Sequence, residues 1–569
     1  MNFIIARSVL EKRSGKMFDV LILLAISIFS FLLSFKAGER GFFAFDQSIV
    51  FDGSYRVLSG QIPYRDFIMP VGPMVFWLQA IFFKFFGTNY FSYILGAAFI
   101  NVLATICSVV VIRILFPSYK FLSYIAGVLT AIWFYPPFGT PWTDQTAFFF
   151  SLLAITVILF AQFYKKGYSV TNSLFLLLSG CFALLSLLSK QNAGVYILPL
   201  YFLLLIAAYL PDLRLTLYSC MVFSTGFIIS SLAFFLWLLL KSDLKIFLKY
   251  FFQIPSLLGA YRISECKADL LKILFGGNCH YVHLHSLPTS IRLIFLFAFL
   301  MSTFMFILYV RNYKNARDIW IRQFLSSILC IYVIFFQYLF IHTAMNQAVN
   351  GISFIGIIFA ISLGLVFHLS KVNSFSRHPV FPESRFFNKN ISKLVLIIGI
   401  SLAFFYVSIL GVKISLSRKV QEFSGSKFPK YFTIEKLKAL RWGQPTKVWG
   451  SDIKEDDIVN LIGYLKLKNK IFFIFPNFTL FYALLNVPSP QPILWFHKGL
   501  TYHVLYDASL DKWIVDDLKK NKVEIMIIEK KPPYYHNTLD DFPQLTSYIS
   551  ESFIETKQIA IFNIYEKKG

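Results

Sequence analysis

Apolar stretches about as long as a membrane-spanning helix follow one another through the first 412 residues of the chain, separated by short polar segments. A helix that crosses a bilayer needs roughly 20 mainly apolar residues, and on that basis the sequence predicts about eleven spans. They lie at residues 17–36, 93–115, 121–136, 146–164, 172–189, 193–211, 216–240, 289–310, 322–343, 350–369 and 392–412. The pattern predicts a polytopic α-helical membrane protein. The first run is expected to be retained, because no small-residue cleavage site follows it.

Two further segments are expected to form helices that lie on the membrane surface. Residues 71–90 are too short to span and are flanked by Pro73 and Gly87. Residues 241–259 have an apolar face and carry lysines one turn apart. Both patterns are typical of interfacial amphipathic helices.

The pattern changes after residue 413. The rest of the chain is charged, and short β-prone runs at residues 470–477 and 523–530 alternate with helix-like segments. Strands and helices in alternation predict a small α/β domain. We therefore expect a transmembrane domain over residues 1–413, with a large polar loop at residues 37–92, and a soluble domain over residues 414–569.

Composition supports the membrane assignment, and the distribution of charge predicts an orientation. The chain is 57% hydrophobic and 15% charged, with a mean hydropathy of +0.63, which is more apolar surface than a soluble protein of this size can hide. The net charge of +24 is concentrated in alternate loops, as the positive-inside rule describes, so it indicates no nucleic-acid partner. We expect a cytoplasmic N-terminus in the cytoplasmic (inner) membrane. The polar loop and the C-terminal domain would then lie on the periplasmic or extracellular side.

The polar loop carries the first candidate chemistry. Its stretch FDQSIVFDGSYRVLSGQIPYRDF occupies residues 45–67. The charged and phenolic residues there are Asp46, Asp52, Arg56, Tyr64, Arg65 and Asp66. Carboxylates at the mouth of a helix bundle indicate binding or catalysis, and arginine beside them suits a lipid-linked phosphate.

This loop also resembles a known family. The pattern S-Y-R-V-L-x-G-Q-I-P-Y-R-D-F, followed by P-V-G-P and an aromatic run ending in F-F-G, resembles the first outer loop of the C-type (GT-C) polytopic membrane glycosyltransferases. That class includes protein O-mannosyltransferases, the lipid A aminoarabinose transferase and many bacterial relatives. The resemblance is detailed over residues 17–195 and architectural beyond them. It implies transfer of a sugar, with inversion, from a polyprenyl-phosphate donor to a lipid, glycan or protein acceptor.

The resemblance also implies roles for single residues. Asp46 would be the general base that activates the acceptor. The family often has Asp-Glu where this chain has Asp46-Gln47, so a second carboxylate for a metal or an acceptor is missing there. Asp144 would be an assisting acid, although its place before an apolar run also suits a helix N-cap. Lys190 would face the donor phosphate, or it could be a lysine that extends to the membrane interface.

The remaining site predictions are less specific. Arg65 is the preferred ligand of the donor phosphate within the loop, because PYRD is the more recognisable part of the pattern. Asp52 and Tyr64 are candidates for substrate binding. His342, in HTAMNQ near the end of a late span, falls where relatives place a polar contact to donor or acceptor.

No cofactor is indicated by the sequence, which carries no nucleotide-binding motif and no zinc signature. We therefore assign no metal ligands, and a divalent cation stays an open alternative. Cys266 and Cys279 share one outer loop and could form a disulfide in an oxidising compartment. The nearby CHYVHLH segment, which contains His280, fits a wet interfacial loop better than a metal site.

Two rival hypotheses follow from other features. An O-antigen ligase or polymerase would also use a lipid-linked donor, and its site would be the late loop with Arg262 and His280. A secondary transporter fits the number of spans, but transporters place ionisable residues near the midplane. Here the polar residues gather at the rim of the predicted spans, which favours an enzyme.

Overall fold

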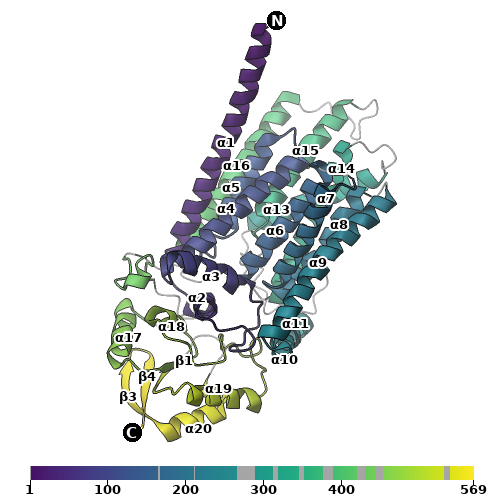
Figure 1. Ribbon diagram of the computed structural model, residues 1–569. Coiled ribbons are helices and arrows are strands. Elements are labelled where there is room, and N and C mark those ends of the chain that lie inside the picture. Colours follow the sequence, from purple (N-terminus) through teal and green to yellow (C-terminus); the bar gives the residue numbers. More distant parts are fainter. Residues whose placement is uncertain are drawn as a thin grey trace.

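A helical bundle and a smaller α/β domain at one of its ends make up the protein (Figure 1). The structure is a computed structural model. It describes residues 2–164, 167–209, 212–265, 289–311, 318–344, 352–375, 389–418, 428, 430–443, 453–530 and 538–569. The N-terminus lies at the opposite end of the bundle from the α/β domain (Figure 1). We call the end of the bundle that carries this domain the domain end.

Each predicted span overlaps one helix of the bundle, although the predicted spans at residues 121–136, 172–189, 193–211 and 350–369 extend by two to five residues beyond the helix bounds. These helices are α1 (Asn2–Gly38), α4 (Tyr90–Leu115), α5 (Lys120–Trp133), α6 (Thr143–Tyr164), α7 (Val170–Leu187), α8 (Gln191–Tyr209), α9 (Leu213–Lys241), α13 (Thr289–Arg311), α14 (Asp318–Ala344), α15 (Ile355–Phe375) and α16 (Lys389–Ser417). Among the described residues, eight helices are long and apolar enough to cross a membrane, while the apolar parts of α5, α14 and α15 are shorter. The prediction of a polytopic helical membrane protein is confirmed, and the number of crossings stays a prediction.

A buried polar network fastens the first helices of the bundle together. The Asn101 amide of α4 donates to the Ser30 hydroxyl of α1 at 2.9 Å and to the Ala131 carbonyl of α5 at 2.9 Å. Its oxygen accepts from the backbone N–H of Tyr135 at 3.1 Å. Hydrogen bonds between helices are well satisfied in such an apolar setting, where water cannot replace them. The network therefore fixes the start of the loop that leads from α5 to α6.

The loop between α1 and α4 forms two helices at the domain end, α2 (Ala44–Leu58) and α3 (Met74–Phe86) (Figure 1). A second group of short helices follows α9 at the same end: α10 (Leu244–Phe247), a π-helix (Leu248–Gln253) and α11 (Ile254–Glu265). Both segments predicted as interfacial helices are therefore helical. Their position relative to a membrane stays a prediction.

The C-terminal domain is built on a four-stranded sheet in the order β1-β2-β4-β3. Strands β1 (Phe472–Phe475) and β2 (Ile525–Glu529) are parallel and confirm the two predicted strands. The sequence analysis missed the antiparallel pair β3 (Phe553–Ile559) and β4 (Phe562–Lys567). The helices are α17 (Glu455–Lys468), α18 (Leu480–Leu485), α19 (Ala508–Lys520) and α20 (Pro543–Ser552), with short 3₁₀ turns at Glu435–Leu437 and Leu539–Asp541.

The α2–α3 loop and the C-terminal domain share one hydrophobic core. Phe51 of α2 and Phe76 of α3 belong to the same buried cluster as Phe473 of β1. The backbone of Ile68 makes two hydrogen bonds to the C-terminal domain. Its N–H donates to the Pro492 carbonyl at 2.6 Å, and its carbonyl accepts from the Leu494 N–H at 3.2 Å. The same cluster also includes Tyr93 and Ile94 of α4, so the loop packs against the bundle as well as the C-terminal domain. Its assignment to the transmembrane domain stays a prediction.

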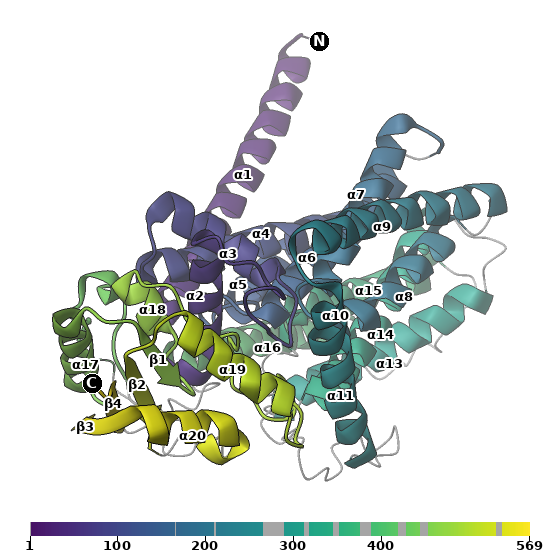
Figure 2. The ribbon, with the colours of Figure 1, turned by 60° about the horizontal axis from the view of Figure 1, so that its bottom comes forward.

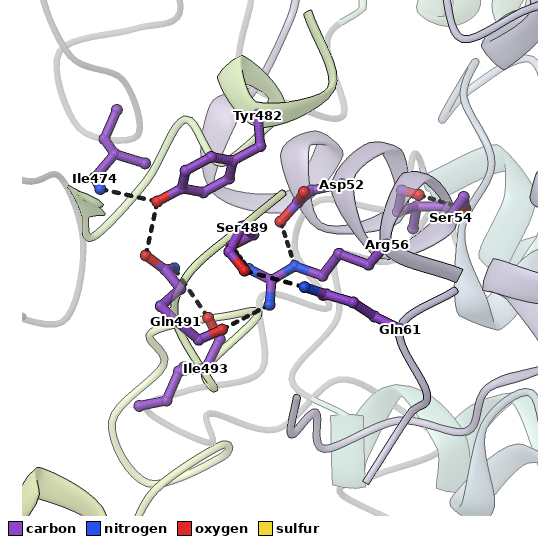
Figure 3. A network of polar contacts seen from close by, with 10 residues as sticks. Asp52, Ser54, Arg56, Gln61, Ile474, Tyr482, Ser489, Gln491 and Ile493 are labelled. Carbon is purple, nitrogen blue, oxygen red and sulfur yellow. Dashed lines mark hydrogen bonds and ion pairs between the residues drawn. The ribbon is translucent and has the colours of Figure 1, made fainter. Parts of the chain in front are cut away.

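A buried ion pair marks the centre of this junction (Figure 3). Arg56 Nε donates to Asp52 Oδ2 at 2.8 Å, and both side chains are fully buried. The same guanidinium donates to the Gln491 carbonyl at 2.7 Å and to the Ser489 hydroxyl. Gln61 adds a bond from its amide to the Ser489 carbonyl at 3.1 Å. Arg56 therefore joins α2 to a segment more than 400 residues later in the chain.

Replacing Arg56 by methionine should weaken this junction strongly. Removing one partner of a buried ion pair leaves an uncompensated carboxylate, which costs about 3–5 kcal/mol. We expect Arg56→Met to lower the thermal unfolding midpoint in detergent and to expose the C-terminal domain to protease. The control is Arg65→Met, because its pair with Asp66 is half-exposed and contributes under about 1 kcal/mol.

The double variant Asp52→Leu/Arg56→Met separates the ion pair from the packing around it. Because both charges are removed, it should regain much of the stability that Arg56→Met loses. An Arg56→Met midpoint as high as that of Arg65→Met would contradict the role given to this pair.

Candidate active site

Asp46 lies in the first turn of α2 at the domain end, on a turn held by its neighbour Gln47. The Gln47 side-chain oxygen accepts from the Phe43 N–H at 2.7 Å, and its amide donates to the Thr140 hydroxyl at 3.0 Å. The Tyr93 hydroxyl donates to the Gln47 carbonyl at 3.0 Å. Gln47 is fully buried, so the residue that replaces the family's second carboxylate anchors the helix start. The N-terminus of a helix also favours a negative charge such as that of Asp46.

Asp144 and Lys190 form an ion pair at the same end of the bundle. The Asp144 carboxylate is completely buried, and the Lys190 side chain is only 16% exposed. Helix α6 begins at Thr143, so Asp144 lies in its first turn and does not precede it as an N-cap residue would. Lys190 stands between α7 and α8 and points inward to Asp144. It does not extend to the surface, as the alternative prediction would require.

The P-V-G-P segment presses directly against the turn that carries Lys190. A Cβ on Gly72 would lie 1.7 Å from the Leu188 carbonyl oxygen, so only glycine permits this approach. The Gln191 amide donates to the Pro70 carbonyl at 2.8 Å. These contacts fix Lys190 relative to the loop that carries Asp46.

The charges of both Asp144 and Lys190 act on Asp46. The pKa of Asp46 is raised to about 7: burial is the largest cause, the charge of Asp144 also raises it, and the charge of Lys190 lowers it. The residue as a whole is partly exposed, while its carboxyl group is buried deeply enough for burial to dominate its pKa. A carboxyl group that titrates near neutral pH is well matched to accept a proton as a general base.

Aromatic side chains from both domains pack together beside the segments that carry Asp46 and Asp144. Trp495 of the C-terminal domain packs against Phe45, next to Asp46, with ring centroids 5.5 Å apart. It also packs edge-on against Trp142 at 6.0 Å, two residues before Asp144. The ring of His497 lies 5.7 Å from Phe45. Sequence reasoning missed Trp495 and His497; the aromatic run around them was the one signal for a role at the site.

The Trp495 indole N–H is buried and has no hydrogen-bond partner among the described residues. Burying a hydrogen-bond donor without a partner costs about 1–3 kcal/mol of folding free energy, so such donors are rare in protein cores. It lies in the part of the C-terminal domain that packs against both acid-bearing segments.

Other predicted site residues lie away from the cluster. The Arg65 guanidinium binds Asp66 at 2.7 Å in a half-exposed position, and Lys520 of α19 acts on the pKa of that carboxylate. Tyr64 is buried, and its hydroxyl donates to the Val71 carbonyl at 2.5 Å, which shapes the loop. Asp52 belongs to the docking pair described above. The structure thus brings together Asp46, Asp144 and Lys190 from the predicted set.

Several predictions fall outside the described residues. His342 lies in the last turn of α14, and its side chain is not described; the same holds for Arg262 in α11. Cys266, Cys279 and His280 lie outside the described part of the chain. Within that part, no group of three or more histidine, cysteine or acidic residues could hold a metal ion.

No protein-family model and no curated protein sequence matches this chain. Among solved structures, ArnT from Cupriavidus metallidurans in the apo state is similar, with a TM-score of 0.52, 11% identity and coverage of 97% of this chain and 98% of that one. ArnT bound to undecaprenyl phosphate gives a TM-score of 0.48, 12% identity and coverage of 96% and 97%. The Archaeoglobus fulgidus oligosaccharyltransferase gives a TM-score of 0.48 and 13% identity, with coverage of 96% of this chain and 74% of that one. The chain therefore has the GT-C fold, as the resemblance of its polar loop implied.

Asp46→Asn should stabilise the folded protein at high pH. Because the pKa of Asp46 is raised from 3.8 to about 7, the folded wild type holds a proton between these values that the unfolded chain releases, and its stability falls as pH rises through this window. Asp46→Asn has no carboxyl group at this position, so its stability does not fall in this way as the pH rises. We expect its unfolding midpoint to exceed that of the wild type at pH 8 and to approach it near pH 4.

The measurement is a pH series of thermal unfolding midpoints in detergent, with Asp243→Asn as the control. Asp243 is the N-cap residue of α10, and asparagine caps about as well as aspartate. A difference between Asp46→Asn and the wild type that does not change with pH would show that Asp46 has an ordinary pKa.

Proposed function

We propose that this protein is a membrane glycosyltransferase that moves a sugar from a polyprenyl-phosphate donor to an acceptor at the domain end of its helix bundle. The observation that supports the proposal is the ion pair between Asp144 and Lys190, both of whose charges act on Asp46. The GT-C fold and the resemblance of the polar loop supply the class of reaction. ArnT from Cupriavidus metallidurans, whose apo structure shares this fold, is a protein solved with undecaprenyl phosphate bound.

Asp46 acts as general base in this proposal. Its carboxylate takes the proton from an acceptor hydroxyl or amine while the acceptor oxygen or nitrogen attacks the anomeric carbon. The bond between that carbon and the phosphate oxygen breaks, and polyprenyl phosphate leaves with the bonding electrons. A single direct displacement inverts the anomeric centre. No protein covalent intermediate forms.

Lys190 and Asp144 set the charge around the reacting atoms. Lys190 is the proposed contact of the donor phosphate, where its ammonium group would balance the charge that develops on the leaving oxygen. Asp144 holds Lys190 in place and keeps the pKa of Asp46 high. Arg65, whose guanidinium binds Asp66 in a half-exposed position, stays the second candidate contact of the donor phosphate.

The donor phosphate is expected at the lipid–water boundary of the domain end, which we propose lies outside the cytoplasm. The described ionisable groups of the site lie at the starts of α2 and α6 and in the turn between α7 and α8. A transporter would need such groups nearer the middle of the spans. This placement favours a surface enzyme over a conduit.

Sugar transfer should depend on Asp46. In membranes that contain the protein, supplied with a set of polyprenyl-phosphate sugars and total cell-envelope acceptors, we expect transfer by the wild type. Asp46→Asn should reduce it by about 10²-fold or more, since a positioned general base contributes about 10²–10⁴-fold. Asp243→Asn, an acid outside the cluster at the same end, should keep full activity.

The outcomes separate the hypotheses. Transfer that survives Asp46→Asn would move the base to another residue, such as those of the late loop. Absence of transfer by the wild type with every donor would favour the transporter hypothesis. Folding of each variant is checked by its unfolding midpoint before the assay.

The pH dependence of transfer should report the electrostatics of the cluster. Activity of the wild type is expected to rise with pH as Asp46 loses its proton, with a midpoint near 7. Asp144→Asn removes a charge that raises the pKa of Asp46, so the midpoint should move to lower pH. Lys190→Met removes a charge that lowers it, so the midpoint should move to higher pH.

Both variants are expected to be slower than the wild type, but the direction of each shift is independent of the rate. Midpoints that stay at the wild-type value in both variants, or that move in the same direction, would mean that these charges do not act on the base.

A further inference from the structure

The loop at residues 503–509 of the C-terminal domain faces the π-helix (Leu248–Gln253) and α11 across a cleft of about 550 Å³. The helix side of the cleft includes Lys249, Gln253 and Leu257, and the domain side includes Leu505 and Asp507. Figures 1 and 2 both show α10 and α11 beside the end of α19 that this loop precedes. The cleft lies at the domain end of the bundle.

Three consecutive residues of the loop present apolar or aromatic surface to the outside. Val504 is 60% exposed, Leu505 is 70% exposed and Tyr506 is 53% exposed. Single exposed apolar side chains are common on soluble domains, but a continuous run marks a contact with something apolar. The domain contains a natural comparison in Leu467 of α17, which is 85% exposed between lysine neighbours.

The helices on the other side of the cleft continue this apolar surface. Leu248 is 48% exposed, Phe252 is 41% exposed and Leu257 is 52% exposed. They follow α9, a helix long and apolar enough to span, whose Leu239 and Leu240 are 54% and 69% exposed. The exposed apolar surface of a predicted span is therefore followed, past the exposed Lys241 and Lys245, by exposed apolar side chains of the π-helix and α11 beside the loop of the domain.

An ion pair holds the two sides of this surface together. Lys249 Nζ lies 2.9 Å from Asp507 Oδ2. Asp507 also caps α19 by accepting from the N–H groups of Ser509 and Leu510. Asp507 thus ties the apolar run of the loop both to the helices across the cleft and to the start of α19.

We propose that residues 504–506 and the exposed sides of the π-helix and α11 together insert into the lipid–water interface of the bilayer. The partner is the membrane lipid itself. Apolar side chains enter the acyl boundary, Tyr506 lies at the headgroup level, and the exposed Lys241 and Lys245 suit the phosphates of anionic lipids. The C-terminal domain then contacts the membrane directly through residues 504–506, in addition to its junction with α2. The cleft opens toward the lipid. This proposal does not rest on the proposed function.

The test places a fluorescent reporter on the surface and asks whether lipid or water surrounds it. In a background whose six cysteines are replaced by alanine, single cysteines at Leu505, Val504, Leu257 and Leu467 are labelled with an environment-sensitive dye. Each protein is placed in nanodiscs of anionic phospholipid with or without bromine on the acyl chains. We expect bromine to quench the dye at Leu505, Val504 and Leu257 at least about twofold more than at Leu467. Aqueous iodide should quench in the opposite order.

The unlabelled wild type provides a second measurement that a dye cannot bias. In nanodiscs, hydroxyl-radical oxidation should modify Leu505 and Tyr506 several-fold less than Leu467, although all three are exposed in the structure.

Three results would overturn the proposal. The dye at Leu505 could respond like that at Leu467, which would place the loop in water. Quenching by bromine at Leu257 alone would leave the helix on the membrane and the domain off it. Protection of Leu505 from both bromine and iodide would mean that protein covers the loop, as in a contact between two copies.

Discussion

The arrangement of the candidate site depends on the buried pair between Asp52 and Arg56. One helix, α2, carries this pair in its second half and Asp46 in its first turn. Arg56 compensates the charge of Asp52 and uses its remaining donors on the carbonyl and hydroxyl groups of residues 489–491, so α2 is fixed to the C-terminal domain. A shift of the domain would therefore move the helix that presents Asp46 to the bundle. The interaction determines position and takes no part in the proposed chemistry.

Two carboxylates on the same short helix are both buried but have different charged neighbours, and this difference assigns their roles. Asp52 has a guanidinium at 2.8 Å, which opposes the burial that raises the pKa of Asp52 to about 6. Asp46 is subject to burial and to the charge of Asp144, which together favour its neutral form, while Lys190 acts in the opposite direction. Pairs of titratable groups whose surroundings differ in this way are typical of acid–base catalysts. The fold tolerates an unfavourable charge at Asp46, and such local cost concentrates at functional sites.

The sequence predicted those parts of the structure that depend on local pattern. Span-length apolar runs predicted the helices, and the short runs at β1 and β2 predicted the central strands. Strand β3 was missed because its middle residues are exposed and lack the alternation of a half-buried strand. Asp46, Asp144 and Lys190 came from the resemblance of the loop to a family. The partner of Arg56 could not be found in that way, since periodicity carries no information about contacts 435 residues apart.

The C-terminal domain contacts the neighbours of Asp46 in the chain, while the charges that act on Asp46 come from the bundle. Burial is the largest cause of the raised pKa of Asp46, and the charges named with it are those of Asp144 and Lys190. Trp495 of the C-terminal domain packs against Phe45, next to Asp46, and against Trp142, two residues before Asp144. The domain therefore supplies neither charge, but it packs beside both acid-bearing segments. Because Arg56 fixes the domain to α2, a loosened junction would disturb this packing first and the surroundings of Asp46 through it.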